Sequence, residues 1–301
     1  MGTGRVEETV AARNTAEHRE RPLSARRICF LATLAWGIVC IPCGVAVSGK
    51  ESVSDAGYTV FAKGLAGPRG LQFDSTGDLF LVEQSGGSIV KITPNGDVSR
   101  PASGFSAPHD LAIDASGNLY VADTGAGRIA RVSPAGSVET YLAHLVEPVD
   151  LAFHPGGELF VCELEAGRVT GYKSKKDVRV VASGLDGPHG LAFDRSGNTF
   201  INEWSGNRVL EAAPDGRIHT VAEVQDPVGV AIGRSGDLYV AQPQAGEVSR
   251  ITRDGKRTLL IGGLNGPRDP AFDSAGNLYV AETGAGRVLR IDRVAEPRST
   301  W

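Results

Sequence analysis

The chain is built from a unit of about forty residues that recurs six times. Each copy carries a proline, an apolar run, a turn rich in Asp and Gly, and a second apolar run that ends in an acidic or amide residue. The prolines that mark the register are Pro68, Pro108, Pro148, Pro188, Pro227 and Pro267. Their successive spacings are 40, 40, 40, 39 and 40 residues. A fixed period of this size indicates a fold assembled from repeated units that pack on one another.

Each repeat contains four strand-like runs separated by turn residues. In the second repeat these runs are residues 109–113, 118–122, 128–132 and 137–142. The intervening turns contain glycine or proline, and the chain has 39 glycines in all. Four short antiparallel strands in about forty residues form the blade of a β-propeller. The sequence therefore predicts an all-β, six-bladed propeller over residues 58–293, with residues 294–301 as a tail.

The sixth repeat ends after its third run, near Arg293, and has no fourth strand of its own. Residues 58–63 (Tyr-Thr-Val-Phe-Ala-Lys) match the fourth runs of other repeats, such as residues 178–183. We therefore expect residues 58–63 to complete the last blade, which would close the ring and remove an open sheet edge. The alternative is a strand outside the ring, beside the membrane.

The N-terminal segment predicts export. Residues 1–27 are polar and end in a basic cluster, and residues 28–47 carry no charge. We expect residues 28–48 to be a hydrophobic helix that serves as a signal peptide or membrane anchor, with residues 49–57 as a linker. A cleaved signal, a retained anchor and a lipoprotein remain open, and each of them places the propeller outside the cytoplasm, secreted, periplasmic or membrane-anchored.

Charge and cysteine content narrow the class of partner. The formal net charge is −4, so no basic surface for nucleic acid is expected. Cys162 is the one cysteine within residues 58–293, which excludes a disulfide inside the propeller. Since it takes the place of Ala122 in the second repeat, it is expected to be a small core residue. We expect a monomer that contacts a membrane only through residues 28–48.

Two positions of the repeat are expected to meet at one end of the axial channel. The first position follows each register proline and opens the innermost strand: Arg69, His109, Val149, His189, Val228 and Arg268. The second position ends the next, antiparallel strand and so reaches the same face: Glu83, Asp123, Glu163, Glu203, Gln242 and Glu282. Blade packing alone requires neither histidines nor arginines at the inner position, which makes this end of the channel a candidate site.

These residue types predict a metal-dependent pocket. The predicted metal ligands are His109, His189, Asp123, Glu163 and Glu203. Imidazole with carboxylate ligands would suit Mn²⁺, Fe²⁺ or Zn²⁺, and carboxylates with water would suit Ca²⁺ or Mg²⁺. His189, Glu203 and His109 are the predicted catalytic residues, acting as general bases beside the metal.

Other side chains of this pocket have two readings. Arg69 and Arg268 are expected to pair with Glu83 and Glu282, or to bind substrate. Trp204 is either a wall of the substrate pocket or a packing residue at the blade edge. Each carboxylate could instead bond the backbone of the next hairpin and serve only the fold.

The repeat, Pro-x-Gly-Leu-Ala-x-Asp-x-x-Gly-Asn-Leu-Tyr-Val-Ala-Asp in its most regular form, resembles NHL-repeat propellers over residues 58–293. Residues 187–193 (Gly-Pro-His-Gly-Leu-Ala-Phe) and 202–208 (Asn-Glu-Trp-Ser-Gly-Asn-Arg) resemble virginiamycin B lyase. The resemblance implies that histidines at blade starts and the Glu-Trp strand end contribute to a metal-dependent site. That family has seven blades, whereas six are counted here.

The chain is also similar in blade number to the six-bladed regucalcin/gluconolactonase family. That resemblance implies divalent-metal ligands at blade starts, a place that His109 or His189 occupies here. The glutamate that this family carries before its first Gly-Pro corresponds to Leu65 or Ala66, so that ligand is absent.

Two functions follow as hypotheses. The first is an exported metal-dependent enzyme that opens a small polar cyclic substrate, by lactone hydrolysis or by a lyase reaction. The second is a non-catalytic extracytoplasmic propeller that binds an envelope glycan, peptide or protein. The metal content of the purified protein distinguishes the two.

Overall fold

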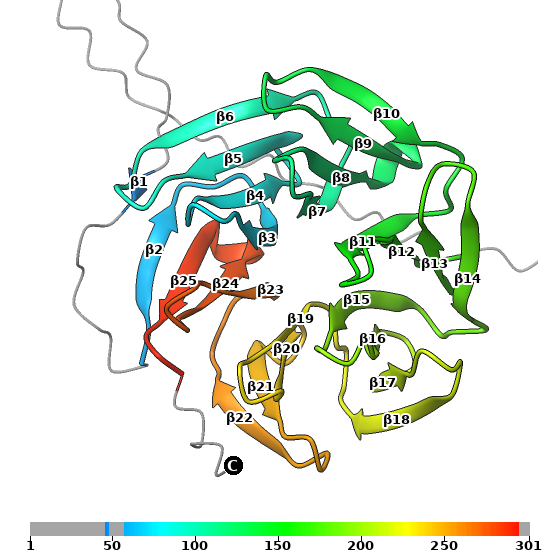
Figure 1. Cartoon of the computed structure of the whole chain (residues 1–301). Coiled ribbons are helices and arrows are strands. Elements are labelled where there is room, and N and C mark those ends of the chain that lie inside the picture. The colour runs from blue at the N-terminus through cyan, green and yellow to red at the C-terminus, as the bar shows by residue number, and fades with distance from the viewer. Residues whose placement is uncertain (1–45, 48–56, 295–301) are drawn as a thin grey trace, which may run out of the picture. The chain divides into compact units, whose positions relative to one another are not determined.

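The computed structural model describes residues 46–47 and 57–294 of the 301-residue chain. Six antiparallel sheets are arranged around a central axis as the blades of a propeller (Figure 1). The six-bladed all-β architecture predicted from the repeats is therefore confirmed. No helix in the described ranges has the length and apolar character needed to cross a membrane.

The first three blades follow the repeats in order. Blade 1 contains β3 (Pro68–Phe73), β4 (Leu79–Glu83), β5 (Ser88–Ile92) and β6 (Val98–Ser103). Blade 2 contains β7 (Pro108–Ile113), β8 (Leu119–Asp123), β9 (Arg128–Val132) and β10 (Val138–Leu142). Blade 3 contains β11 (Pro148–Phe153), β12 (Leu159–Glu163), β13 (Arg168–Tyr172) and β14 (Val178–Ser183).

Blades 4 to 6 continue the ring, and blade 5 has a shortened inner strand. Blade 4 contains β15 (Pro188–Phe193), β16 (Thr199–Glu203), β17 (Arg208–Ala212) and β18 (Ile218–Glu223). Blade 5 contains β19 (Val230–Ile232), β20 (Leu238–Gln242), β21 (Glu247–Ile251) and β22 (Arg257–Ile261). Blade 6 contains β23 (Pro267–Phe272), β24 (Leu278–Glu282) and β25 (Arg287–Ile291) from the end of the chain.

The fourth strand of blade 6 comes from the start of the propeller. Strand β2 (Thr59–Lys63) pairs antiparallel with β25, with Val60 opposite Leu289 and Lys63 opposite Arg287. The predicted closure by residues 58–63 is thus confirmed. The expected helix over residues 28–48 lies outside the described residues except at Ala46–Val47, which form strand β1 against β2.

The repeated Asp and Gly residues explain the turn between the first two strands of a blade. In blade 2, Asp114 Oδ1 accepts the backbone N–H of Ser116 at 2.8 Å and that of Asn118 at 2.9 Å. Gly117 between them has a φ of +77°, which glycine adopts without steric cost. The hydrogen bonds to the Asp114 side chain and the left-handed conformation of Gly117 together reverse the chain direction within four residues.

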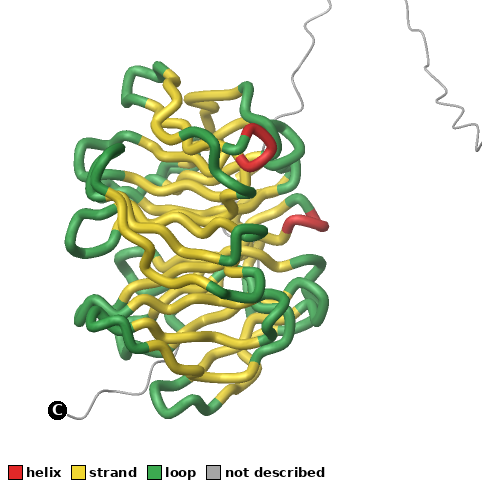
Figure 2. Tube along the Cα trace, turned by 90° about the vertical axis from the view of Figure 1, so that its right-hand side faces the viewer, coloured by secondary structure: helices red, strands yellow, loops and turns green. Residues whose placement is uncertain are grey.

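The hydrophobic core lies between neighbouring blades. In the interface of blades 1 and 2, for example, the fully buried Val82 and Ile89 pack in one cluster with Leu111 and Val121. Burial of each such side chain stabilises the fold by roughly 1.5–3 kcal/mol. Viewed from the side (Figure 2), the loops lie on the two faces of the disc, and the short 3₁₀ turns η1 (Thr124–Ala126) and η2 (Thr283–Ala285) lie on the same face.

Candidate functional site

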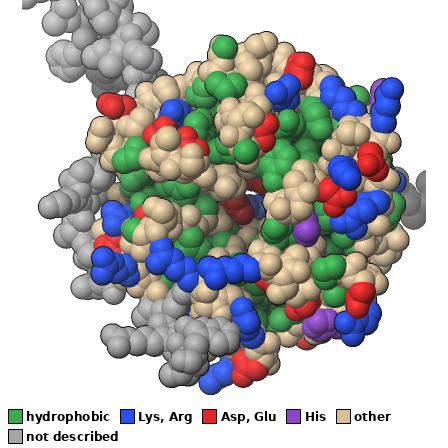
Figure 3. All heavy atoms as spheres, viewed as in Figure 1, with side chains coloured by type: hydrophobic (Ala, Val, Ile, Leu, Met, Phe, Trp, Pro, Cys, Tyr) green, Lys and Arg blue, Asp and Glu red, His purple; other side chains and the backbone are tan. Residues whose placement is uncertain are grey.

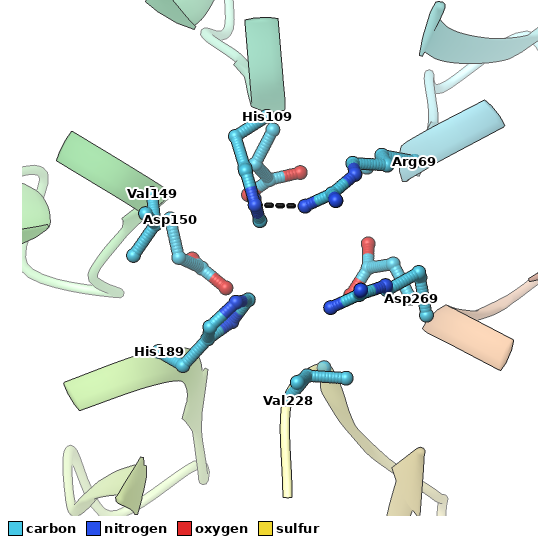
Figure 4. Close-up of a pocket in the computed structure, with 11 residues that line it drawn as sticks. Arg69, His109, Val149, Asp150, His189, Val228 and Asp269 are labelled. Atoms are coloured by element: carbon cyan, nitrogen blue, oxygen red, sulfur yellow. Dashed lines mark hydrogen bonds between the residues drawn. The ribbon is translucent and has the colours of Figure 1, made fainter. Parts of the chain in front are cut away.

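The residues that follow the register prolines meet at one end of the axial channel. We call them the channel mouth: Arg69, His109, Val149, His189, Val228 and Arg268. Their side chains converge on the axis from six blades (Figure 4). The space open to water-sized molecules among them is about 20 Å³, room for about one water. A larger ligand would therefore rest against this end of the channel rather than pass through it.

The two histidines face each other across the mouth and are neutral. Their ring centroids are 5.0 Å apart and their planes are inclined by 63°. Burial and the adjacent Arg268 and Arg69 lower the pKa of His189 to about 3. Burial, Arg69 and His189 hold the pKa of His109 well below its usual value. Both imidazoles are thus neutral at pH 7.

The hydrogen bonds of the two rings differ. A guanidinium group can only donate, so His109 Nε2 accepts a hydrogen bond from Arg69 Nη1 (Figure 4). This bond requires His109 to carry its proton on Nδ1. The ring of His189, by contrast, has no hydrogen bond to another residue in the described part of the chain. His189 is therefore the base with a nitrogen free for a ligand.

The two arginines of the mouth form no ion pair with a carboxylate among the described residues, although the charge of Asp226 acts on Arg268 from a longer distance. Burial and the charge of Arg268 lower the pKa of Arg69 to about 9, and burial lowers that of Arg268. Both groups remain charged at pH 7, and the Nε atom of each is buried without a hydrogen-bond partner. Two close cations with unused donors form a site that favours an anionic or strongly polarised oxygen.

The predicted partners of these arginines are engaged elsewhere, which corrects the sequence analysis. Glu83 pairs with Arg100, with Nε at 3.0 Å from Oε2, and Glu282 pairs with Arg287. Each of the two glutamates also accepts a backbone N–H from the loop before its own blade's register proline. The expected Arg69–Glu83 and Arg268–Glu282 pairs do not form.

The predicted metal-ligating carboxylates are bonded in the same way, each by an arginine and by a backbone N–H. We call this arrangement the clasp. Asp123 pairs with Arg128 at 2.7 Å and Glu163 pairs with Arg168 at 2.7 Å. Glu203 pairs with Arg208. Each also accepts the N–H of the residue two positions before the register proline: Ser106, Val146 and Asp186. The structural reading of this repeat position, a bond to a neighbouring loop, is the one observed.

These clasps remove the acids from the mouth, so the predicted metal ligands are not assembled. Asp123, Glu163 and Glu203 are fully buried and do not line the channel. Within residues 57–294, no group of three His, Cys, Asp or Glu side chains is arranged to hold a metal ion. The two imidazoles are moreover flanked by two guanidinium cations, which would repel a divalent ion. The residues present therefore do not fit the expected metal.

Three aspartates that the sequence analysis passed over form the channel floor beneath the mouth. They are Asp110, Asp150 and Asp269, each the second residue after its register proline. Burial and mutual repulsion raise the pKa of Asp110 and Asp150 well above the usual value. Burial raises the pKa of Asp269 to about 7. The channel floor thus holds protons that surface carboxylates would have lost.

Each aspartate of the channel floor ties its blade to the next. Asp269 Oδ2 accepts the N–H of Leu71 at 2.9 Å, and Asp150 Oδ2 accepts that of Leu191 at 3.2 Å. The other three blades carry Gly70, Gly190 and Gly229 at the same position. A Cβ on Gly70 would lie 2.3 Å from Asp110 Oδ1. Since this repeat position contains only Asp or Gly, its composition was the signal that could have revealed the channel floor.

A second cavity lies on the other side of the channel floor. Its volume is about 290 Å³, and it is lined by apolar side chains of the inner strands together with Gln72 and the three aspartates of the channel floor. The space-filling view shows an opening at the centre of the molecule with charged atoms inside it (Figure 3). The aspartates of the channel floor therefore line both the mouth and this cavity.

Two further predicted residues lie away from the mouth. Trp204 does not line the channel but a separate pocket between blades 4 and 5. Cys162 is fully buried in the core between blades 3 and 4, and burial raises the pKa of its thiol. Cys162 is thus the small core residue that its repeat position predicts.

Comparison with known proteins supports the fold. Residues 105–131 match the NHL repeat model. The virginiamycin B lyase of Staphylococcus aureus, solved as an inactive histidine-to-alanine variant with quinupristin, has a TM-score of 0.62 at 16% identity, covering 82% of this chain and 92% of that chain. No curated protein sequence matches the chain.

Two other solved structures are similar. A gluconolactonase of Xanthomonas campestris has a TM-score of 0.68 at 18% identity, covering 75% of this chain and 86% of that chain. A luciferin-regenerating enzyme has a TM-score of 0.68 at 17% identity, covering 77% and 93%. The chain thus contains an NHL repeat and has the fold of lyase and lactonase propellers.

Proposed function

We propose that the channel mouth is the active site of an enzyme that opens a small polar cyclic substrate, by lactone hydrolysis or by elimination. The observation that carries this proposal is the neutral His189 beside Arg69 and Arg268, two cations that form no ion pair with a carboxylate among the described residues. A free base next to unpaired positive charge is what a reaction with a developing oxyanion needs.

In lactone hydrolysis, His189 would accept a proton from the attacking water and return it to the ring oxygen as the bond between that oxygen and the acyl carbon breaks. The guanidinium groups of Arg69 and Arg268 would bind the carbonyl oxygen as it gains negative charge in the tetrahedral intermediate. In a lyase reaction, His189 would remove the proton next to the carbonyl, and the arginines would stabilise the resulting enolate. The enolate would then expel the oxygen on the β-carbon as a carboxylate, which opens the ring and leaves a carbon–carbon double bond. His109, hydrogen-bonded to Arg69, would position that guanidinium.

The negative charge that develops during the reaction would itself raise the pKa of His189. Repulsion by Arg268 and Arg69 contributes to its low pKa. A negative oxygen placed between the arginines would offset that repulsion and raise the pKa of His189, bringing the base closer to the pH at which it works.

The structural neighbours support an enzyme rather than prove one. The S. aureus lyase loses activity when one histidine is replaced by alanine, and another neighbour is a gluconolactonase. A histidine-dependent ring-opening reaction is therefore consistent with the fold. Because Glu203 is clasped by Arg208, it has no catalytic role in this proposal.

The test is a panel of lactones and cyclic depsipeptides with the purified protein. Turnover of at least one is expected, and His189→Ala should reduce kcat/KM by about 100-fold or more. His219→Ala, which changes an exposed histidine on β18, should leave it unchanged. Elemental analysis of the same sample tests the divalent metal that the sequence predicted. Saturable binding of ligands with no turnover of any would favour the non-catalytic alternative.

We further propose that the propeller works outside the cytoplasm, exported by residues 28–48. The uncharged run after a basic cluster supports this. Alkaline phosphatase fused after Lys50 should be active in a bacterial host. An inactive fusion that is nevertheless expressed would refute export.

A further inference from the structure

Departures from the repeat gather at the junction of blades 4 and 5. Blade 4 has Asn202 at a position where the other blades have small or apolar residues. It has Trp204 at a position where the other blades have Gln, Thr, Leu or Pro. Asn207 replaces the glycine that precedes the third strand in all other blades. The single 39-residue spacing ends at Pro227, just after Asp226. Since packing rules are broken mainly where function demands it, this junction is a candidate site.

A pocket opens where these departures meet. It is lined by Trp204, Ser205, Asn207, Gln225, Asp226, Gln244 and Ala245. About 550 Å³ of it is open to water-sized molecules, within the range of small-molecule sites. We call it the junction pocket. It is wide enough to enclose a ring-sized ligand, whereas a ligand of that size would rest against the outer side of the mouth.

Trp204 presents a fixed aromatic surface in the junction pocket. Its side chain is 39% exposed, whereas most large apolar residues of the inner strands are buried. The indole Nε1 donates a hydrogen bond to Asp226. Asp226 also accepts two hydrogen bonds from Gln244. The backbone N–H of Gln244 donates to Oδ2 at 3.0 Å, and the side-chain Nε2 of Gln244 donates to Oδ1 at 3.2 Å. The indole is therefore held in one orientation before any ligand arrives.

Asn207 fixes the position of Asp226. Both residues are in the left-handed region, with φ of +54° and +52°, a conformation that the repeat also has in other blades, as at Ala107 with a φ of +48°. What is particular to this junction is the hydrogen bond of 2.9 Å from Asp226 N–H to Asn207 Oδ1. Asn207 thereby holds the residue that bonds the indole of Trp204.

The remaining groups of the junction pocket are neutral amides. Gln225 is exposed, and its side chain has no hydrogen-bond partner within the described ranges. The pocket contains no Lys or Arg, and its one carboxylate, Asp226, is taken up by Trp204 and Gln244. Amides both donate and accept, as hydroxyl groups do. An aromatic face flanked by the free amide of Gln225 and by the amide oxygen of Gln244 suits a ring that has C–H bonds on its faces and hydroxyls at its edge.

We propose that the junction pocket binds a neutral pyranose ring stacked on Trp204, with its hydroxyl groups bonded to Gln225 and Gln244. The pocket adjoins the mouth, because the charge of Asp226 acts on Arg268 and Val228 follows two residues later. The sugar would thus be the glycosidic part of a substrate whose carbonyl group reaches Arg268. This last step rests on the proposed function, whereas the binding of the sugar does not.

The test is titration of the full chain with neutral monosaccharides and their methyl glycosides, followed by ligand-observed NMR and calorimetry. At least one should bind saturably, and Trp204→Ala should weaken binding at least 10-fold. Trp204→Phe, which keeps an aromatic face, should retain part of the affinity. Gln84→Ala, the matched change at the same repeat position of blade 1, should have no effect. Circular dichroism checks that each variant is folded.

The outcomes separate this proposal from the proposed function. His189→Ala should abolish turnover and leave sugar binding intact. If the parent binds a sugar, the Trp204→Ala variant does not, and no substrate is turned over, the result would support the junction pocket. It would count only against the proposed enzymatic function. Lack of binding by every sugar, or equal binding by Trp204→Ala, Trp204→Phe and the parent, would overturn the inference even if lactones are hydrolysed.

Discussion

Replacing one aspartate of the channel floor should change how stability depends on pH. Asp269 is buried, and burial raises its pKa from 3.8 to about 7. The folded state therefore holds a proton on Asp269 at pH values where the unfolded chain has lost it. The stability that this proton contributes is fully present below about pH 4 and is lost as the pH rises through about 7.

The magnitude follows from the shift of about three pH units. At 1.36 kcal/mol per unit, the ionised Asp269 costs the folded state roughly 4 kcal/mol at pH 8 relative to pH 4. Asp110 and Asp150, whose pKa values are also raised, extend this loss to higher pH. An asparagine at 269 keeps an oxygen for the Leu71 N–H but has no proton to lose.

The assay is urea denaturation of parent and Asp269→Asn between pH 5 and pH 8. The parent should lose stability as the pH rises, and the variant should lose roughly 3 kcal/mol less over this range, so that at pH 8 it is the more stable of the two. Asp74→Asn is the control, because hydrogen bonds from Thr76 and Asp78 lower the pKa of Asp74 although desolvation opposes them. Asp74 is therefore ionised in both the folded and the unfolded state between pH 5 and pH 8, and its replacement should leave the pH slope of the parent unchanged. Equal pH slopes for parent and Asp269→Asn would refute the reasoning.

Other substitutions test separate parts of the structure. Arg268→Met should raise the pKa of His189 above about 3, measured by the pH dependence of its ring NMR signals, and an unchanged value would contradict the repulsion argued here. Gly70→Ala places a Cβ 2.6 Å from the Cα of Asp110 and should cost about 1–3 kcal/mol in thermal or urea unfolding. Gly262→Ala, with its nearest neighbour at 3.8 Å, should cost far less, and equal losses would refute the close-approach argument. Glu163→Ala should cost about 2–4 kcal/mol by the same measurement, since it strips the acceptor from Val146 N–H and Arg168. Glu163→Gln should cost less, because an amide oxygen can still accept one of these hydrogen bonds; blade 5 has Gln242 at this position, whose Nε2 instead donates to the Gln225 carbonyl oxygen at 2.9 Å.

The architecture could be predicted from the repeat because local and long-range signals agree. The spacing of Pro68 to Pro267, the turn residues and the resemblance of residues 58–63 to a fourth strand all point to one ring. The position after each proline likewise has to face the axis, since it opens the innermost strand. His109, His189, Arg69 and Arg268 were therefore placed together from the sequence.

The sequence wrongly predicted that the carboxylates point into the channel mouth. The direction of each side chain depends on its arginine and backbone partners, which the repeat pattern alone does not identify. Glu163 ends its strand on the expected face but turns to Arg168, five residues later, and to Val146 N–H. Arg128, Arg168, Arg208 and Arg287 all lie five residues after a strand-end acid, a pattern that would have revealed the clasp. Asp269 was missed for another reason. An acidic residue one step inside an apolar strand looks like an outward position until the channel is built.

The seam formed by β2 and β25 has a consequence for synthesis. Val60 and Leu289 are neighbours in one sheet although almost the whole propeller separates them along the chain. During synthesis five blades can form. In the sixth blade, however, the outermost strand β2 lacks its blade partner β25 until that strand, which ends at residue 291, has left the ribosome. The growing chain thus exposes the unmatched edge of β2 until β25 has been made, and only then can the two strands pair. Circular permutants opened at another hairpin would move that vulnerable moment to a different blade.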